Sequence, residues 1–431
     1  MKTTTSLWAA VWMLAGAAWN TGMAQPRETL TLAQAKAIAL RNHPRIHSAG
    51  LVAQAVGTTV KQARAPYFPM LSGNFTSAGA QQDTAVAAGA LTTSSLASRL
   101  ASGVTVSQMI TDFGRTGSLT ETARLKAAAQ NRTVENTRAQ VLFEVEQAYY
   151  QALSAQAVLK AAQAAAENRR LTLRQVSALA QSAMKSTLDV SFAEVSVSEA
   201  ELELYRAEND VQAGQMRLAA ALGSESNTTY ELVDEALPPP LSPDVDTFVA
   251  QALKDRPDLA ALLLSRDAAQ HFADAEKRLL YPSISLLGVL GEVPQRDQRL
   301  HGNYSAVGLN VSIPILNGGL FTARREEAAL RARAASDDVR DLTVQIARDV
   351  RIAWLEANTA FRRLDVTARL VSEADQALRL AQLRYDNGLG SIVELNQAQL
   401  NQTAAQIEAA SAKYQYLSRR AALDFAIGAL L

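Results

Sequence analysis

The feature of this sequence that most constrains its fold is Thr116–Ala183, a very long stretch with no proline and one glycine, Gly117. A heptad repeat runs through it from Val134. Twelve of its fourteen a and d positions are apolar, the exceptions being Arg138 and Arg169. A seven-residue repeat sustained over this length predicts a coiled-coil helix that packs lengthwise on neighbouring helices. At about 1.5 Å per residue, such a helix is roughly 100 Å long.

The same helical pattern returns later in the chain at a constant offset, so that Val134 corresponds to Val339. Twelve of the fourteen a and d positions between Val339 and Tyr385 are again apolar, in the same register as in the first copy. The tripeptide Asp112-Phe113-Gly114 has its counterpart in Asn317-Gly318-Gly319 at the same offset. One chain therefore contains an internal two-fold repeat, and each half carries one very long helix.

Each half also contains two uncharged segments with a different periodicity. The clearest is residues 307–315, in which Val or Leu or Ile alternates with Gly, Asn or Ser. Segments of about ten residues in which apolar and polar side chains alternate are typical of strands in membrane β-barrels. The alternative interpretation is a pair of strands in a soluble protein with two packed sheets. Four strands per chain cannot close a barrel, and open sheet edges are not tolerated in lipid. Closure therefore needs several chains. Three would give a 12-stranded barrel, and the pattern alone also allows two or four.

The repeat predicts how the chain is divided. The plan is a signal peptide at residues 1–24, a first structural repeat at 25–222, a linker at 223–244 and a second repeat at 245–431. The first repeat contains strands at about 67–80 and 100–111, a long helix at 116–183 and a helix at 187–222. The second contains strands at about 282–292 and 304–315, a long helix at 321–387 and a helix at 392–427. Two shorter helices open each half. The loop Gln81–Leu100 is expected to be eight residues longer than its counterpart at 292–302, and both are expected to face the cell exterior.

Composition narrows the class of protein. The chain has 42 Lys and Arg against 42 Asp and Glu, a balance that does not suggest a nucleic-acid-binding surface. It has no cysteine, which excludes disulfides and thiolate metal sites. Lys2, the apolar run Leu7–Ala18 and the small residues Gly22-Met23-Ala24 form a typical secretory signal. We therefore expect the mature chain to begin at Gln25, outside the cytoplasm.

No constellation of residues suggests catalysis or a cofactor. Asp112-Phe113-Gly114 matches the magnesium-binding tripeptide of protein kinases, but the other kinase motifs are missing and its repeat counterpart is a turn sequence. His43 and His47 are four residues apart, yet Pro44 intervenes and no third ligand is near, which argues against a metal site. We expect neither an enzyme nor a bound cofactor.

Two short motifs mark the far ends of the long helices. Gly388 and Gly390 end the second long helix, and Ser391–Glu394 opens the next helix as a capping box. Ser186–Asp189 occupies the same place in the first half. The carboxylates of these motifs could serve only as helix caps. Alternatively, they could form part of an acidic ring at the narrow end of a tube, and both roles are compatible.

The repeat and its motifs together resemble those of a known protein family. The mature chain is similar to outer-membrane efflux proteins of the TolC family in its duplicated plan and in three motifs: Ala65–Pro69, Pro314–Gly319 and Tyr385–Leu395. The resemblance implies a homotrimer with a 12-stranded outer-membrane barrel above a long periplasmic coiled-coil α-helical barrel, closed near the tip turns. In that family two aspartates follow the second tip turn. Here Glu394 matches the first of them and Gln397 stands in place of the second.

The resemblance also implies site residues and partners. The candidates for a periplasmic constriction are Asp189, Glu394 and Gln397. The candidates for the helix-hairpin tips and for contact with an adaptor are Met184, Lys185, Ser186, Asn387, Gly388, Leu389 and Gly390.

The expected function is a passive exit duct in outer-membrane lipid with a long periplasmic extension. It would serve an inner-membrane transporter and a periplasmic adaptor protein, in an efflux or a type I secretion system. The alternative is a periplasmic coiled-coil adaptor or scaffold without a membrane barrel. The alternating strands in both halves favour the duct.

Overall fold

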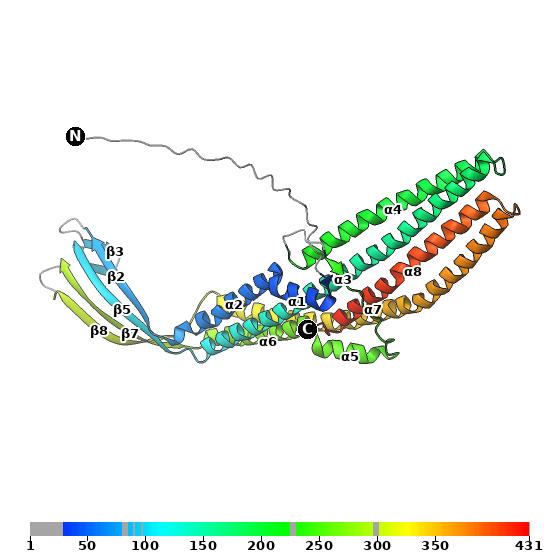
Figure 1. Cartoon of the computed structure of the whole chain (residues 1–431). Helices are drawn as coiled ribbons and strands as arrows, with labels where there is room; N and C mark the ends of the chain where they lie inside the picture. The colour runs from blue at the N-terminus through cyan, green and yellow to red at the C-terminus, as the bar shows by residue number, and fades with distance from the viewer. Residues whose placement is uncertain are drawn as a thin grey trace, which may run out of the picture.

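The computed structural model describes residues 29–79, 85–88, 91–95, 98–224, 230–295 and 301–430. The predicted signal peptide lies outside the described residues. The described chain is elongated, with a β-sheet at one end and the ends of four long helices at the other (Figure 1). None of the described helices has the length and apolarity that crossing a bilayer requires.

The helices of the two halves have equal lengths. The first half contains α1 (Leu32–Asn42, 11 residues), α2 (Pro44–Arg64, 21), α3 (Arg115–Gln181, 67) and α4 (Thr187–Ala221, 35). The second half contains α5 (Val245–Asp255, 11 residues), α6 (Pro257–Lys277, 21), α7 (Leu320–Asp386, 67) and α8 (Ile392–Ala426, 35). The predicted internal repeat is therefore present residue for residue in the helical part.

The backbone turns repeat with the same spacing. The described residues with positive φ are Phe113, Gly114, Ala183 and Gly223 in the first half and Gly318, Gly319, Gly388 and Gly428 in the second. Taken in order they form four pairs, and the offset within each pair is the one that relates the two long helices. The turn at Asp112 is a strand-to-helix turn, as predicted, because its carboxylate accepts hydrogen bonds from the backbone of Gly114 (3.1 Å) and Thr116 (2.6 Å).

The boundary between the first two helices explains the His43–His47 pair. Pro44 is the first residue of α2, where its missing N–H costs nothing. His43 caps this helix, since its Nδ1 accepts a hydrogen bond from the N–H of Arg45 (3.2 Å). His43 is also buried, and burial lowers its pKa. It therefore serves as a neutral helix cap.

Four strands form one antiparallel sheet. They are β2 (Met70–Ala78), β5 (Arg99–Thr111), β7 (Ser283–Gln295) and β8 (Asn303–Ser312), in the order β2-β5-β7-β8. The pairing of β5 with β7 joins the two halves, with Val104 opposite Leu290. Strand β8 ends before Pro314, three residues earlier than predicted, because proline has no N–H to donate to a ladder. Strand β2 begins three residues later than predicted, after a short 3-10 turn at Ala65–Tyr67.

Four shorter strands were not predicted. Strands β3 (Ala85–Ala88) and β4 (Leu91–Ser95) form a hairpin within the segment expected to be a simple loop, a correction to the prediction. Strands β1 (Thr29–Leu30) and β6 (Glu231–Leu232) form a parallel pair, so the predicted linker is partly sheet. Two-residue strands are too short to show a periodicity. This pair depends on a tertiary contact, because the Tyr149 hydroxyl lies 2.8 Å from Leu30 O and 2.7 Å from Val233 O.

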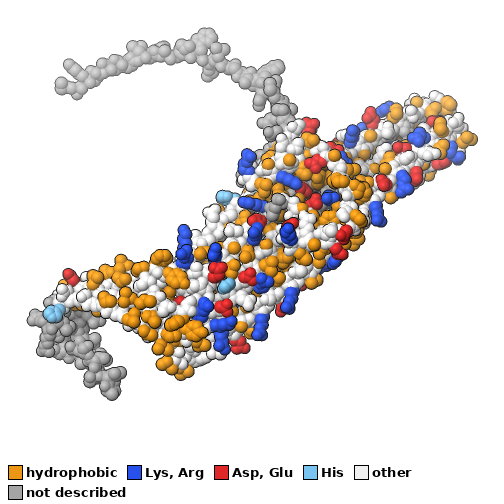
Figure 2. Space-filling model, turned by 90° about the horizontal axis from the view of Figure 1, so that it is seen from below, with side chains coloured by type: hydrophobic (Ala, Val, Ile, Leu, Met, Phe, Trp, Pro, Cys, Tyr) orange, Lys and Arg blue, Asp and Glu red, His pale blue; other side chains and the backbone are white. Residues whose placement is uncertain are grey.

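The buried core is divided along the molecule. One cluster lies where α1, α3 and α4 meet the β1–β6 pair, and a second lies between α5, α7 and α8. A third lies at the far ends of the long helices. Of the two arginines on the predicted seam of α3, Arg138 is exposed and Arg169 is buried. Figure 2 shows the contrast at the surface: hydrophobic side chains gather at the sheet end, and charged side chains spread along the helices.

Candidate gate at the helical tips

The candidate site lies at the end of the molecule farthest from the sheet (Figure 1). There the chain reverses twice, through a first tip turn at residues 182–186, between α3 and α4, and a second at residues 387–391, between α7 and α8. All of the predicted tip and constriction residues lie in these turns or in the first two turns of the helices that follow them.

The two tip turns have the same backbone. Ala183 has φ of 54° and Gly388 has φ of 71°, both in the left-handed region. The N–H of Met184 donates to Leu179 O (2.9 Å), and the N–H of Leu389 donates to Arg384 O (2.8 Å). Such bonds across a left-handed residue terminate helices by satisfying their last carbonyl groups. Both reversals therefore close with the same hydrogen-bond pattern, with glycine at the left-handed position of the second turn and alanine at that of the first.

Behind the turns, one tyrosine organises a small apolar core. Tyr385 is 3% exposed and packs with Val176, Ala381, Ile392 and Leu395. Burial raises the pKa of its phenol to about 12, and the negative charges of Asp189 and Asp386 add to this effect. The phenol is therefore neutral at physiological pH and acts as part of the apolar core.

Lys185 joins the first tip turn to the second. Its Nζ donates a hydrogen bond to Tyr385 O (3.0 Å) and lies 3.8 Å from the centroid of the Tyr385 ring. A second bridge lies deeper, where Asn396 Nδ2 of α8 donates to Phe192 O of α4 (3.2 Å). The helical hairpins of the two halves are thus held together at their ends by polar contacts as well as by packing.

Asp189 caps its own helix. The side chain of Ser186 accepts from the backbone at the start of α4, and the Ser186 N–H donates to Asp189 Oδ2 (3.1 Å). This reciprocal pair is the predicted capping box. The capping role of Asp189 is confirmed.

Glu394 is held differently. The hydroxyl of Ser391 accepts from the N–H of Glu394 (3.2 Å), which is one half of the predicted capping box. The carboxylate instead pairs with Arg384, with Nε and Oε1 2.9 Å apart, so the prediction of a complete box is corrected. Arg384 lies in the last turn of α7, across the glycine-containing turn, and a guanidinium is a stronger partner for a carboxylate than a neutral N–H. Gln397 Nε2 donates to Asn401 Oδ1 on its own helix (3.0 Å).

Both tips carry exposed apolar side chains. We call Met184, Leu188, Leu389 and Val393 the tip patch; their exposed fractions are 70, 62, 72 and 55%. Two residues that shape the site, Arg384 and Tyr385, were absent from the predicted site residues. Tyr385 was detectable as a seam position of the second long helix. The partner of Glu394 was not, because it is set by how the turn folds back.

Comparisons with known proteins extend these observations to the whole chain. The family model described as outer membrane efflux protein matches residues 37–224 and 248–429. Nodulation protein T of Rhizobium leguminosarum bv. trifolii is 24% identical over 385 residues, which cover 87% of this chain and 80% of that protein. Outer membrane efflux protein BepC of Brucella suis biovar 1 is 26% identical over 425 residues, which cover 95% of this chain and 87% of that protein.

A solved structure shows the same fold. The outer membrane protein VceC from Vibrio cholerae superposes with a TM-score of 0.80 at 20% identity, covering 92% of this chain and 96% of that one. The likeness extends over nearly the whole of this chain and shows that the two proteins share one fold. The family model covers both halves of the repeat, and the chain therefore belongs to the outer membrane efflux protein family, as an outer-membrane exit duct for efflux systems.

Proposed function

We propose that three copies of the chain form one continuous passive duct, with a 12-stranded barrel in the outer membrane and a helical tunnel in the periplasm. The observation that carries this proposal is the open sheet. Strands β2 and β8 stand at its edges, each paired on one side only within the described chain. Strand β8 exposes the apolar side chains of Val307 (79%) and Leu309 (62%). Lipid cannot satisfy unpaired backbone groups, so β8 of one copy must pair with β2 of the next.

Cysteine cross-linking tests this closure, because the natural chain has no cysteine to interfere. Single cysteines placed along β2 and β8 at residues 71–77 and 305–311 are combined in pairs and oxidised in outer membranes. We expect at least one register to give covalent dimers and trimers and no larger species. A stable monomer in native mass measurement of the detergent-solubilised protein would contradict the proposal.

We further propose that the tips form the closed periplasmic end, where an inner-membrane transporter and a periplasmic adaptor engage the duct. The exposed tip patch supports an adaptor contact, because it offers apolar side chains to a partner at both helix reversals. The bridge from Lys185 to Tyr385 supports a closed resting state, since it ties the two hairpins of each chain together.

Within this end, the Glu394–Arg384 pair sets the charge of the constriction. Three-fold symmetry would bring three copies of Glu394 towards one axis, where rings of carboxylates favour cations. Arg384 offsets part of this charge in each copy. Removing either partner should therefore shift ion selectivity in opposite directions.

Planar-bilayer recordings test this role of Glu394. Glu394→Gln should lower cation selectivity, and Arg384→Gln should raise it, with trimer assembly intact in both. The cap at this helix end runs from the backbone N–H of residue 394 to the Ser391 hydroxyl and does not use the Glu394 side chain, so it is preserved in the first variant. Unchanged selectivity in both variants would leave Glu394 as a helix-end residue without a role in conduction.

A further inference from the structure

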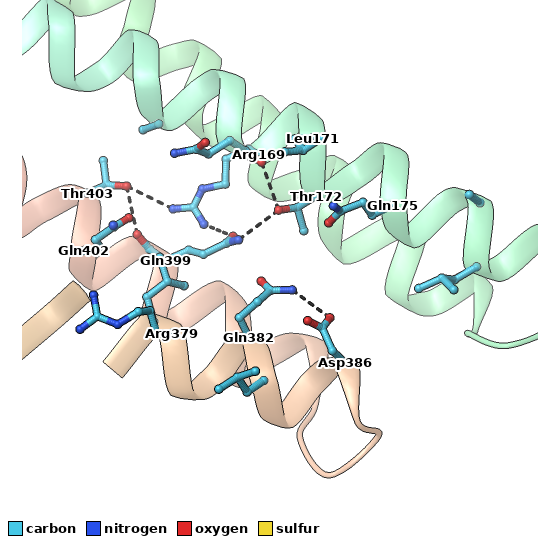
Figure 3. Close-up of a pocket in the computed structure, with 16 residues that line it drawn as sticks. Arg169, Leu171, Thr172, Gln175, Arg379, Gln382, Asp386, Gln399, Gln402 and Thr403 are labelled. Carbon is cyan, nitrogen blue, oxygen red and sulfur yellow. Dashed lines mark hydrogen bonds between the residues drawn. The ribbon is translucent and has the colours of Figure 1, made fainter. Parts of the chain in front are cut away.

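A cavity of about 890 Å³ lies between α3, α7 and α8, on the tip side of the molecule (Figure 3). This volume lies within the range of pockets that hold small organic molecules. Its lining includes Arg169 and Thr172 from α3, Arg379 from α7, and Gln399 and Thr403 from α8. The two halves of the repeat therefore both contribute to it.

The unusual group in this cavity is Arg169, which is 4% exposed. Its guanidinium donates to Gln399 Oε1 and, over 3.3 Å, to Thr403 Oγ1, both neutral acceptors. In the described part of the chain Arg169 forms no ion pair with a carboxylate. Burial lowers its pKa to about 10, and the distant charge of Glu199 offsets this only in part. A buried cation without a counter-charge is costly, so an anion that reaches it would be bound favourably.

Other charges in the lining favour an anion as well. Arg379, an exposed arginine of α7, supplies a second positive charge, although Figure 3 shows its guanidinium directed away from Arg169. The lining carboxylate, Asp386, is already engaged, because it accepts from Gln382 Nε2 (3.0 Å). Figure 3 shows Arg169 near the middle of the group, with Gln382 and Asp386 paired to one side. The cavity thus carries two cationic groups and one hydrogen-bonded carboxylate.

The remaining lining is apolar and amide-rich. Leu171, Leu179, Leu378 and Leu383 provide the hydrophobic part of the lining, and side-chain amides such as those of Gln175 and Gln382 also line the cavity. Such a lining suits a ligand with one acidic group and a hydrophobic body. The repeat position of Arg169 is Ala374, so the second half has no equivalent cation and the site occurs once per chain.

We propose that this cavity binds amphipathic organic anions, with the acidic group on Arg169 and the hydrophobic body against the leucines, and with the positive charge of Arg379 adding to the attraction. The site is distinct from the tip constriction, and its occupancy does not require conduction. A ligand there would contact both hairpins of one chain at once.

Calorimetric titration of the full-length protein in lipid nanodiscs tests the proposal, with empty nanodiscs as the blank. The probe is naphthalene-2-sulfonate, and its uncharged analogue naphthalene-2-sulfonamide is the matched control ligand. We expect saturable binding of one sulfonate per chain and binding of the sulfonamide weaker by about tenfold, the usual effect of losing a charged hydrogen bond. Equal binding of the two ligands, or no saturable binding, would overturn the proposal.

Two variants assign the binding to this cavity. Arg169→Gln should weaken binding of the sulfonate about tenfold. Arg138→Gln, which removes an exposed arginine of the same helix seam, should leave it unchanged. Arg379→Gln, at the second cation, should weaken sulfonate binding while leaving sulfonamide binding unchanged, and it provides the test if Arg169→Gln does not assemble. Equal losses in the Arg138 and Arg169 variants would place the anion elsewhere.

Discussion

The two halves of this chain have the same helices and turns but place different residues at the positions where φ is positive. In the second half, glycine occupies each position with positive φ, whereas Phe113 and Ala183 occupy two of the equivalent positions in the first half. A left-handed conformation costs a residue with a Cβ about 1–2 kcal/mol. Phe113 is supported by an edge-to-face contact with Tyr281, with ring centroids 6.3 Å apart. Surrounding contacts can therefore impose a turn that the local sequence does not favour.

The halves also differ in burial. The central helix of the first half, α3, buries more than twice as many of its residues as its repeat counterpart α7, although the two helices are equally long. Towards the tips, α3 lies between α4 and α8, whereas α7 lies at one edge of the row of helices (Figure 1). Within a single chain, the two equivalent helices therefore pack against different neighbours. Because α7 buries fewer of its residues, we expect it to contact a neighbouring chain in the proposed trimer.

The largest expected effect comes from making the second tip resemble the first. Tyr385→Ala places at this position the residue found at its repeat counterpart, Ala180. Truncating a buried aromatic residue costs about 3–5 kcal/mol, and the loss should appear as local opening of the tip. Hydrogen exchange of the amides in residues 376–396 measures it. Tyr205→Ala, at a 63% exposed tyrosine of α4, is the control and should change exchange little. Equal protection in the two variants would show that Tyr385 does not hold the tip.

A smaller effect is expected from exchanging the residues with positive φ at the two tips. Gly388→Ala should destabilise the second tip by about 1 kcal/mol, because alanine resists the left-handed conformation. Ala183→Gly should stabilise the first tip by a similar amount for the same reason. Limited proteolysis at each turn, compared with the unaltered chain, measures both. Changes of the same sign in the two variants would contradict the equivalence of the turns.

The smallest expected effect concerns Glu146, a buried carboxylate of the first half whose repeat counterpart is exposed. Burial raises the pKa of Glu146 above its ordinary value of 4.5, an effect that its ion pair with Lys36 partly opposes. The equivalent residue of the second half, Arg351, is exposed and pairs with Asp246 (3.1 Å).

Because the folded protein holds the Glu146 proton more tightly than the unfolded chain, its contribution to stability is complete below pH 4.5. That contribution is lost as the pH rises through the raised pKa. Glu146→Gln should therefore reduce the fall in melting temperature between pH 4 and pH 7. Glu144→Gln, at a carboxylate that is half exposed, should keep the fall unchanged. A steeper fall in melting temperature in the Glu146 variant would contradict a raised pKa of Glu146 in the folded protein.

Most of the architecture could be predicted from local sequence. The heptad pattern, the absence of proline and the turn and capping residues determine the four long helices, because each depends on neighbours within one or two helical turns. The same holds for the Ser186–Asp189 capping box and for the positions of the four main strands. The internal repeat was visible as a constant offset between equivalent sequence positions, which the turns of the backbone reproduce.

The tertiary structure alone decided which side chains meet. Arg138 and Arg169 interrupt the same seam of the same helix, yet one is exposed and the other is buried against α8. Glu394 and Asp189 occupy equivalent cap positions, yet Glu394 pairs with Arg384 across the turn. Periodicity reports only which face of a helix is apolar. The burial of Arg169 depends on helices of the two halves packing against each other, and the pairing of Glu394 depends on how the second tip turn folds back.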